Sequence, residues 1–123
     1  MSEDRFDAAH ALGRRGEEIA LEYFRRKGYR IVERGFRLFR GEIDLVAYDG
    51  DTLVFIEVKT RATTEFGLPE EAVTPAKQSQ IRKIARGFLM ERSQGEPDCR
   101  FDVLAILAPE EGDPVITHYK NAF

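Results

Sequence analysis

The sequence predicts an α/β or α+β fold, a mixed sheet flanked by helices, with the element order α-β-β-β-α-β-β. Two segments show helical periodicity, and five short runs are rich in Ile, Val, Phe and Tyr. A helix between the third and fourth strands predicts a right-handed crossover that makes those strands parallel. The chain has 123 residues, the usual size of one domain, so we expect residues 1–123 to form a single domain.

The first helix is expected over Ala8–Lys27. Its apolar or small residues recur at the spacing of one helix face, with charged residues elsewhere, and Gly28 is suited to ending it. The residues on that face are Leu12, Gly16, Ile19, Ala20, Tyr23 and Phe24.

Three strands are expected next, over Tyr29–Phe36, Glu42–Tyr48 and Leu53–Thr60. The first two are separated by Arg37–Gly41 and the last two by Asp49–Asp51. The shorter, glycine-containing connection predicts that the second and third strands form a hairpin.

The second helix is marked by Thr74, a suitable N-cap, and by Pro75 at the first helical position. An apolar stripe continues to about Arg92. Two further strands are expected over Phe101–Leu107 and, more weakly, over Val115–Tyr119.

Charge argues against a broad phosphate-binding surface, because the net charge is −3 and the pI about 5.5. The charge is uneven: residues 59–90 hold six Lys or Arg and three Glu (+3), whereas residues 91–123 hold three Lys or Arg and seven acids (−4). A local basic surface is therefore compatible with the composition.

The acidic start and the lack of a long apolar run predict a soluble, cytoplasmic protein that does not enter a membrane. Cys99 is the only cysteine, so it cannot form an internal disulfide, and we expect it to be a small buried hydrophobe. His10 and His118 lack ligand spacing, which argues against zinc. For Asp102, near the start of a strand, we expect a structural hydrogen bond.

The third strand, Leu53–Thr60, is apolar on both faces until Glu57, which shares a face with Lys59. Burying these two charges costs several kcal/mol each unless they are paired or bound to a ligand. Two interpretations stay open for this strand: a salt bridge at the edge of a sheet, or a functional site.

Asp44 on the neighbouring strand favours the functional interpretation. A two-residue turn, Asp49-Gly50 or Gly50-Asp51, would place Asp44 and Glu57 on one face, opposite each other or one pair apart. Two carboxylates and a backbone carbonyl, here that of Val58, could hold Mg²⁺.

Such a site suits phosphodiester hydrolysis, in which a metal ion provides hydroxide near neutral pH and shares in stabilising the charge on the phosphate. Lys59 would orient the water or stabilise that charge. Glu17, on the border of the first helix's apolar face, is the better third acid, since Glu18 points away; an ordinary surface role for Glu17 stays open.

A set of short motifs extends along nearly the whole chain. They are Gly13-x-x-Gly16-Glu17-x-x-Ala20, Lys27-Gly28-Tyr29, Gly41-Glu42-Ile43-Asp44-Leu45, Phe55-Ile56-Glu57-Val58-Lys59-Thr60-Arg61, Phe66-Gly67, Ala72-Val73, Lys77-Gln78, Phe101-Asp102-Val103 and Asn121-Ala122-Phe123. Together these motifs resemble the bacterial YraN family of uncharacterised, predicted nucleases.

That family in turn resembles restriction-endonuclease-like enzymes, including archaeal Holliday junction resolvases. The resemblance implies a fold of that type, with Glu17, Asp44, Glu57 and Lys59 as catalytic residues and Mg²⁺, or Mn²⁺ in its place, as cofactor. It also lends Gln78 a catalytic meaning, with a solvated first-turn position as the alternative, and it implies a homodimer.

Among the cations, Arg40 and Arg61 are the first candidates for phosphate contacts, because both lie at the same end of the predicted hairpin. Lys77 is either another phosphate contact or simple surface. The irregular stretch Arg61–Val73 is a candidate binding loop.

These residues predict a metal-dependent endonuclease acting on DNA, with branched DNA as one candidate substrate. The alternative is a non-catalytic nucleic-acid-binding or adaptor protein that needs a basic, unidentified protein partner. RNA also stays open as a substrate, because no aromatic platform or base-reading motif is evident in the sequence.

Overall fold

The structure is a computed structural model that describes residues 2–65, 67–92 and 95–123, with side chains from residue 8 onward. The elements are α1 (Ser2–Arg26), β1 (Arg30–Leu38), β2 (Gly41–Asp49), β3 (Thr52–Arg61), the 3₁₀ helix η1 (Pro69–Ala72), α2 (Pro75–Glu91), β4 (Cys99–Leu107) and β5 (Val115–Tyr119). This order confirms the predicted fold class.

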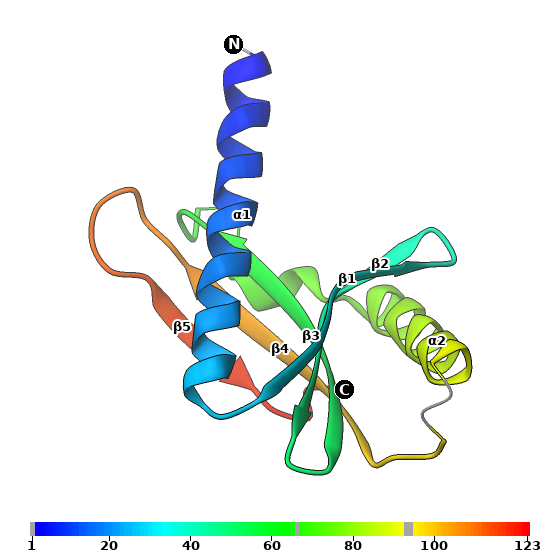
Figure 1. The fold of residues 1–123 in the computed structure, drawn as a ribbon. Coiled ribbons are helices and arrows are strands. Elements are labelled where there is room, and N and C mark those ends of the chain that lie inside the picture. Colours follow the sequence, from blue (N-terminus) through cyan, green and yellow to red (C-terminus); the bar gives the residue numbers. More distant parts are fainter. Residues whose placement is uncertain (1, 66, 93–94) are drawn as a thin grey trace.

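The five strands form one sheet in the order β1-β2-β3-β4-β5 (Figure 1). Within the part of the chain that the structure describes, only the β3–β4 pair is parallel, as expected for strands joined through α2, and the other three pairs are antiparallel.

The two helices cover opposite faces of the sheet, as the alternation of side chains along β3 shows. Val54 and Ile56 belong to a core cluster that includes Phe24 of α1. Leu53 and Phe55 lie in a second cluster, made with residues of α2. The central strand is therefore buried on both faces, and its polar end lies between the two helices.

Several boundaries differ from the sequence prediction. Helix α1 begins at Ser2, earlier than the predicted Ala8. The prediction missed the first turns of the helix because the apolar periodicity on which it depended starts only at Leu12. The expected separation at Arg37–Gly41 is wrong: β1 and β2 continue to a two-residue turn, with Leu38 paired to Gly41. Most of the predicted binding loop is irregular, but it contains η1, and Phe66 lies outside the described residues.

The prediction for Cys99 was wrong. Its side chain is exposed, because β4 begins two residues earlier than expected and Cys99 is its first residue. Among the described residues, no helix is long and apolar enough to cross a membrane.

Candidate functional site

The β2–β3 hairpin brings the two predicted acids together. Asp49 pairs with Thr52, so the turn is Gly50-Asp51, one of the two predicted turns, and Gly50 takes the positive φ (60°) that such a turn requires. The register continues to Leu45, which pairs with Ile56. Asp44 directly precedes Leu45 on β2, and Glu57 directly follows Ile56 on β3, so both acids lie next to that last pair.

Asp44 spans the gap where the two strands separate. Its Oδ2 accepts a hydrogen bond of 2.8 Å from the backbone N–H of Val58. This bond fixes the carboxylate beside β3 and uses only one of its oxygens, so Oδ1 remains for a ligand.

Glu57 is 2% exposed, although it carries a carboxylate. Its Oε2 lies 3.8 Å from Nζ of Lys59, longer than the roughly 2.7–2.9 Å of a charge-assisted hydrogen bond. Its Oε1 is buried and has no hydrogen-bond partner among the described residues. A buried, unsatisfied carboxylate oxygen is costly, which makes it the most informative atom of the site.

The two carboxyl groups perturb each other. Burial, followed by the nearby charge of Asp44, raises the pKa of Glu57 to about 7, although Lys59 and Lys77 act in the opposite direction. Burial also raises the pKa of Asp44, against the hydrogen bond from Val58. Buried acids with raised pKa values in close contact are typical of functional sites.

A hollow of about 230 Å³ opens beside Asp44 and is lined by Glu17 from α1, by Glu42 and by Val58, among others. Glu17 therefore borders the same hollow as Asp44. Its helix approaches β3 closely because residue 16 is a glycine: a Cβ on Gly16 would overlap the Thr60 hydroxyl.

The donor atoms fit a magnesium site with two protein carboxylates. Oxygen ligands suit Mg²⁺, which usually keeps several waters and binds through one or two carboxylates. The hollow has the volume of several waters, at about 30 Å³ each, and it borders Asp44, whereas Glu57 is not among its lining residues. Within the described residues, no three Asp, Glu, His or Cys side chains are grouped to hold a metal ion, so Glu17 does not complete a set of three carboxylates.

The predicted cations occupy different places. Arg40 and Lys77 line a second hollow, of about 540 Å³, between the β1–β2 hairpin and α2. Arg61 is exposed at the end of β3. Gln78 lies apart from Asp44: its Nε2 donates to the Val73 carbonyl at 3.2 Å, and its side chain lines a hollow beside β4 and β5.

Two residues near the site were missed by the sequence reasoning. Glu42 lines both hollows and its charge raises the pKa of Asp44. Its position two residues before Asp44 on the same strand was a usable signal. Gln80 of α2 lines the second hollow and carried no comparable signal.

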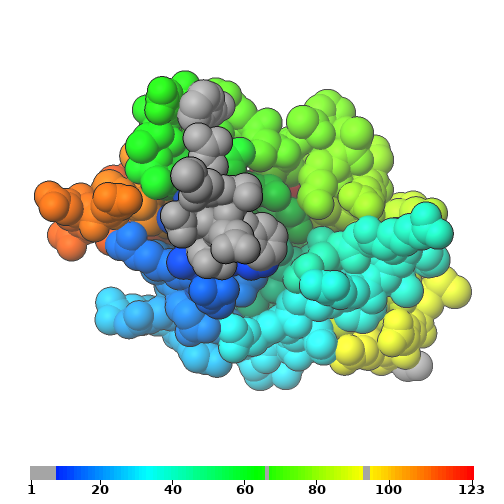
Figure 2. Space-filling view, turned by 90° about the horizontal axis from the view of Figure 1, so that it is seen from above, coloured from blue at the N-terminus to red at the C-terminus, as the bar shows by residue number. Residues whose placement is uncertain are grey.

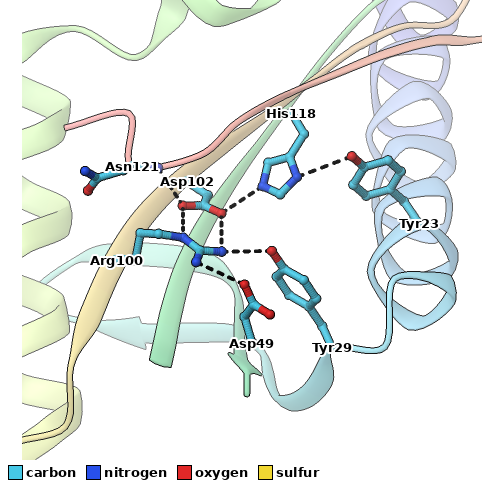
Figure 3. A network of polar contacts seen from close by, with 7 residues as sticks. All are labelled: Tyr23, Tyr29, Asp49, Arg100, Asp102, His118 and Asn121. Atoms are coloured by element: carbon cyan, nitrogen blue, oxygen red, sulfur yellow. Dashed lines mark hydrogen bonds and ion pairs between the residues drawn. The ribbon is translucent and has the colours of Figure 1, made fainter. Parts of the chain in front are cut away.

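A separate polar network holds Asp102, which is fully buried (Figure 3). Two nitrogens of Arg100 donate to its carboxylate at 2.9 and 3.1 Å, and the backbone N–H of Asn121 donates at 2.9 Å. His118 Nε2 lies 2.8 Å from Asp102 Oδ2, and the other ring nitrogen lies 3.3 Å from the Tyr23 hydroxyl. Burial alone would raise the pKa of Asp102, but these hydrogen bonds lower it.

This network is structural. It joins β4 to β5 and to α1, and Arg100 also donates to Tyr29 and Asp49. The predicted structural hydrogen bond of Asp102 is therefore confirmed.

The fold and the site together define an α+β protein with a buried carboxylate pair where two strands of a mixed sheet separate. The chain belongs to the uncharacterised protein family UPF0102, whose model matches residues 16–106. It is 53% identical over 119 residues to a UPF0102 protein of Chlorobium limicola, which covers 93% of this chain and 92% of that relative.

A UPF0102 protein of Geobacter sulfurreducens is 50% identical over 112 residues, covering 91% of this chain and 88% of the relative. The predicted membership in an uncharacterised family is thus confirmed. These family descriptions name no activity, so the nuclease assignment stays a prediction.

Proposed function

We propose that this protein is a metal-dependent endonuclease that hydrolyses phosphodiester bonds of DNA. One observation carries the proposal: Glu57 Oε1 is buried without a partner among the described residues, and the Asp44 carboxylate is close enough to raise the pKa of Glu57. A divalent cation held between them would give both acids a counter-charge and Oε1 a partner.

In this proposal Asp44 and Glu57 hold Mg²⁺, or Mn²⁺ in its place, and the Val58 carbonyl is the third candidate ligand. When bound, the ion supplies positive charge against the phosphate and makes water more acidic. Lys59 orients the attacking water and stabilises the charge that develops on the phosphate. As the water oxygen bonds to phosphorus, the water gives up a proton to the surrounding solvent; the bond between phosphorus and the leaving sugar oxygen breaks, and the leaving oxygen takes up a proton from solvent.

Glu17 has the role of a supporting acid that acts through water, because it is exposed beside Asp44 rather than in contact with Glu57. Arg40 and Lys77 are proposed phosphate contacts along the second hollow, and Arg61 is a further one at the end of β3. The catalytic role proposed for Gln78 rests only on the resemblance of the chain to resolvases, which carry a Gln at a similar position.

The resolvase resemblance also supports a restriction-endonuclease-like fold, branched DNA as substrate and a homodimer that makes two incisions. These are parts of the proposal that rest on analogy.

The test is cleavage of labelled linear, single-stranded, flapped and four-way-junction DNA with Mg²⁺ or Mn²⁺. Wild type is compared with Asp44→Asn and Glu57→Gln, and with Glu111→Gln as a control at an exposed acid between β4 and β5. We expect cleavage by wild type and by the control, and loss of cleavage in both site variants, with circular dichroism showing that all four proteins fold. Cleavage that persists in both site variants would contradict the assignment.

A non-catalytic adaptor is the second candidate, and the Glu57–Lys59 pair favours it together with the net negative charge. In this case the two charges stabilise each other and no metal binds. Calorimetric titration with Mg²⁺ separates the candidates: heat of binding in wild type that is lost in Glu57→Gln supports the nuclease. DNA binding without any Mg²⁺ binding or cleavage supports the adaptor.

A further inference from the structure

The turn between β1 and β2 has an unusual backbone for its residues. Phe39 and Arg40 have φ angles of 52° and 58°, the left-handed conformation at both central positions of a two-residue hairpin turn. Asn and Gly normally occupy such positions, and a residue such as Phe or Arg costs about 1–2 kcal/mol there. Strain of this type is concentrated at functional sites.

The hairpin is also fixed against α2. A Cβ on Gly41 would come within 2.6 Å of Ile84, and a Cβ on Gly87 would overlap Leu38 and lie 3.2 Å from the Phe39 ring. Figure 1 shows the hairpin extending over α2, and Figure 2 shows the cyan hairpin beside the yellow-green helix at one edge of the molecule. The position of the turn is therefore set by packing.

The ring of Phe39 is nevertheless 53% exposed at this fixed position. The Lys83 ammonium lies 4.8 Å from the ring centroid and leaves part of the ring open to solvent. An exposed aromatic ring beside cations is the arrangement with which proteins bind single-stranded nucleic acids, whose bases stack on the ring.

The hollow next to this turn is basic and leads toward the acids. Arg37, Arg40 and Lys77 line it. Its volume of about 540 Å³ is within the usual 300–1,000 Å³ of small-molecule sites. Lys77 is close enough to affect the pKa of Glu57, and Glu42 borders both this hollow and the smaller hollow beside Asp44. The hollow thus places three cations suited to phosphates next to the turn that carries Phe39.

We propose that Phe39 is a stacking platform for an unpaired base of the DNA substrate, with Arg37, Arg40 and Lys77 binding the neighbouring phosphates. The site then selects DNA with unpaired nucleotides next to the bond that is cut, whereas a fully paired duplex has no free base for the ring. This inference rests on the proposed function and assigns it a substrate class.

The test measures binding with EDTA present, so that it does not depend on cleavage. The probe is a duplex that carries 2-aminopurine at an unpaired, bulged position, with the fully paired duplex for comparison. We expect wild type to change the fluorescence of the bulged probe, and Phe39→Leu to weaken its binding by roughly 5- to 150-fold, the effect of removing one stacked base. Phe39→Tyr, which keeps the ring, and Met90→Ala, at an exposed apolar residue at the end of α2, should bind like wild type.

The outcomes separate this inference from the proposed function. Equal binding of the bulged probe by wild type and Phe39→Leu, or no binding by wild type, overturns the stacking platform even if DNA is cleaved in an Asp44-dependent way. Phe39-dependent binding without cleavage under either metal supports the platform and contradicts the nuclease. Equal loss of binding to bulged and paired DNA in Phe39→Leu also overturns selection of an unpaired base.

Discussion

Replacing Glu57 by Gln should stabilise the metal-free protein above neutral pH. The pKa of Glu57 is about 7 in the folded protein against 4.5 for an unperturbed Glu. The folded state therefore holds this proton more tightly than the unfolded state, and stability is full below pH 4.5 and falls as pH rises through 7. A difference of about 2.5 in pKa corresponds to about 3–4 kcal/mol, at about 1.4 kcal/mol for each unit of pKa.

The assay is urea unfolding in EDTA at intervals between pH 5 and pH 8. Glu57 should cost wild type about 2–3 kcal/mol across this range, since part of its effect is already lost below pH 5, and Asp44 adds to the loss because its pKa is also raised. Glu57→Gln should be flatter and more stable than wild type at pH 8, since comparing the two proteins cancels other groups that titrate. Parallel pH profiles would refute the reasoning, because they would mean that Lys59 already compensates a charged Glu57.

The same two proteins, unfolded with urea in the absence of EDTA, test whether a metal ion binds at Glu57. Mg²⁺ at pH 8 should raise the unfolding free energy of wild type by about 2.7 kcal/mol at 100 times the dissociation constant, and should leave Glu57→Gln nearly unchanged. The apparent affinity should increase between pH 6 and pH 8, because the ligands must lose their protons. Equal stabilisation of both proteins would contradict metal binding at Glu57.

Two further predictions concern packing and the structural network. Gly16→Ala should lower the free energy of unfolding by about 1–3 kcal/mol by pressing on Thr60, and it should lower cleavage by moving Glu17. Gly13→Ala in the same helix has open space and should raise the free energy of unfolding by about 0.5–1 kcal/mol. Equal unfolding midpoints of the two variants would contradict this. Asp102→Asn should cost about 3–5 kcal/mol at pH 7, because it breaks a buried pair with Arg100. Since the pKa of Asp102 is lowered, the stabilisation by its charged form is present above the ordinary pKa range of Asp and is lost as pH falls below that range. Urea unfolding should therefore show a smaller difference in unfolding free energy between wild type and Asp102→Asn at pH 3 than at pH 7.

The sequence predicted what depends on local signals. The β2–β3 turn was readable because Gly50 is suited to a positive φ, and once the turn was known, the register up to Leu45 and Ile56 placed Asp44 and Glu57 next to the last pair. The burial of Glu57 followed from the apolar run before it.

Signals that come from distant contacts could not be read in this way. The turn at Phe39 and Arg40 contains no Gly or Asn, and it becomes understandable only once α2 packs against it. The partners of Asp102 include His118 and Asn121, which reach it only through β5 and the turn that follows. No spacing in the sequence announces such a set.

A comparison of the two buried acids explains why Glu57 is better understood as a ligand than as a defect of packing. Ile56 pairs with Asp102 across the parallel strands, so Glu57 and Asp102 lie at nearly the same level of the sheet, on opposite faces. On the α1 face the fold surrounds Asp102 with four polar contacts. On the α2 face, the Glu57 carboxylate has a backbone hydrogen bond from Asp44 and one long ion pair, while its Oε1 has no partner among the described residues. The fold is thus able to satisfy a buried carboxylate at this level, and where it does not, a cation from solution is the group that would complete the site.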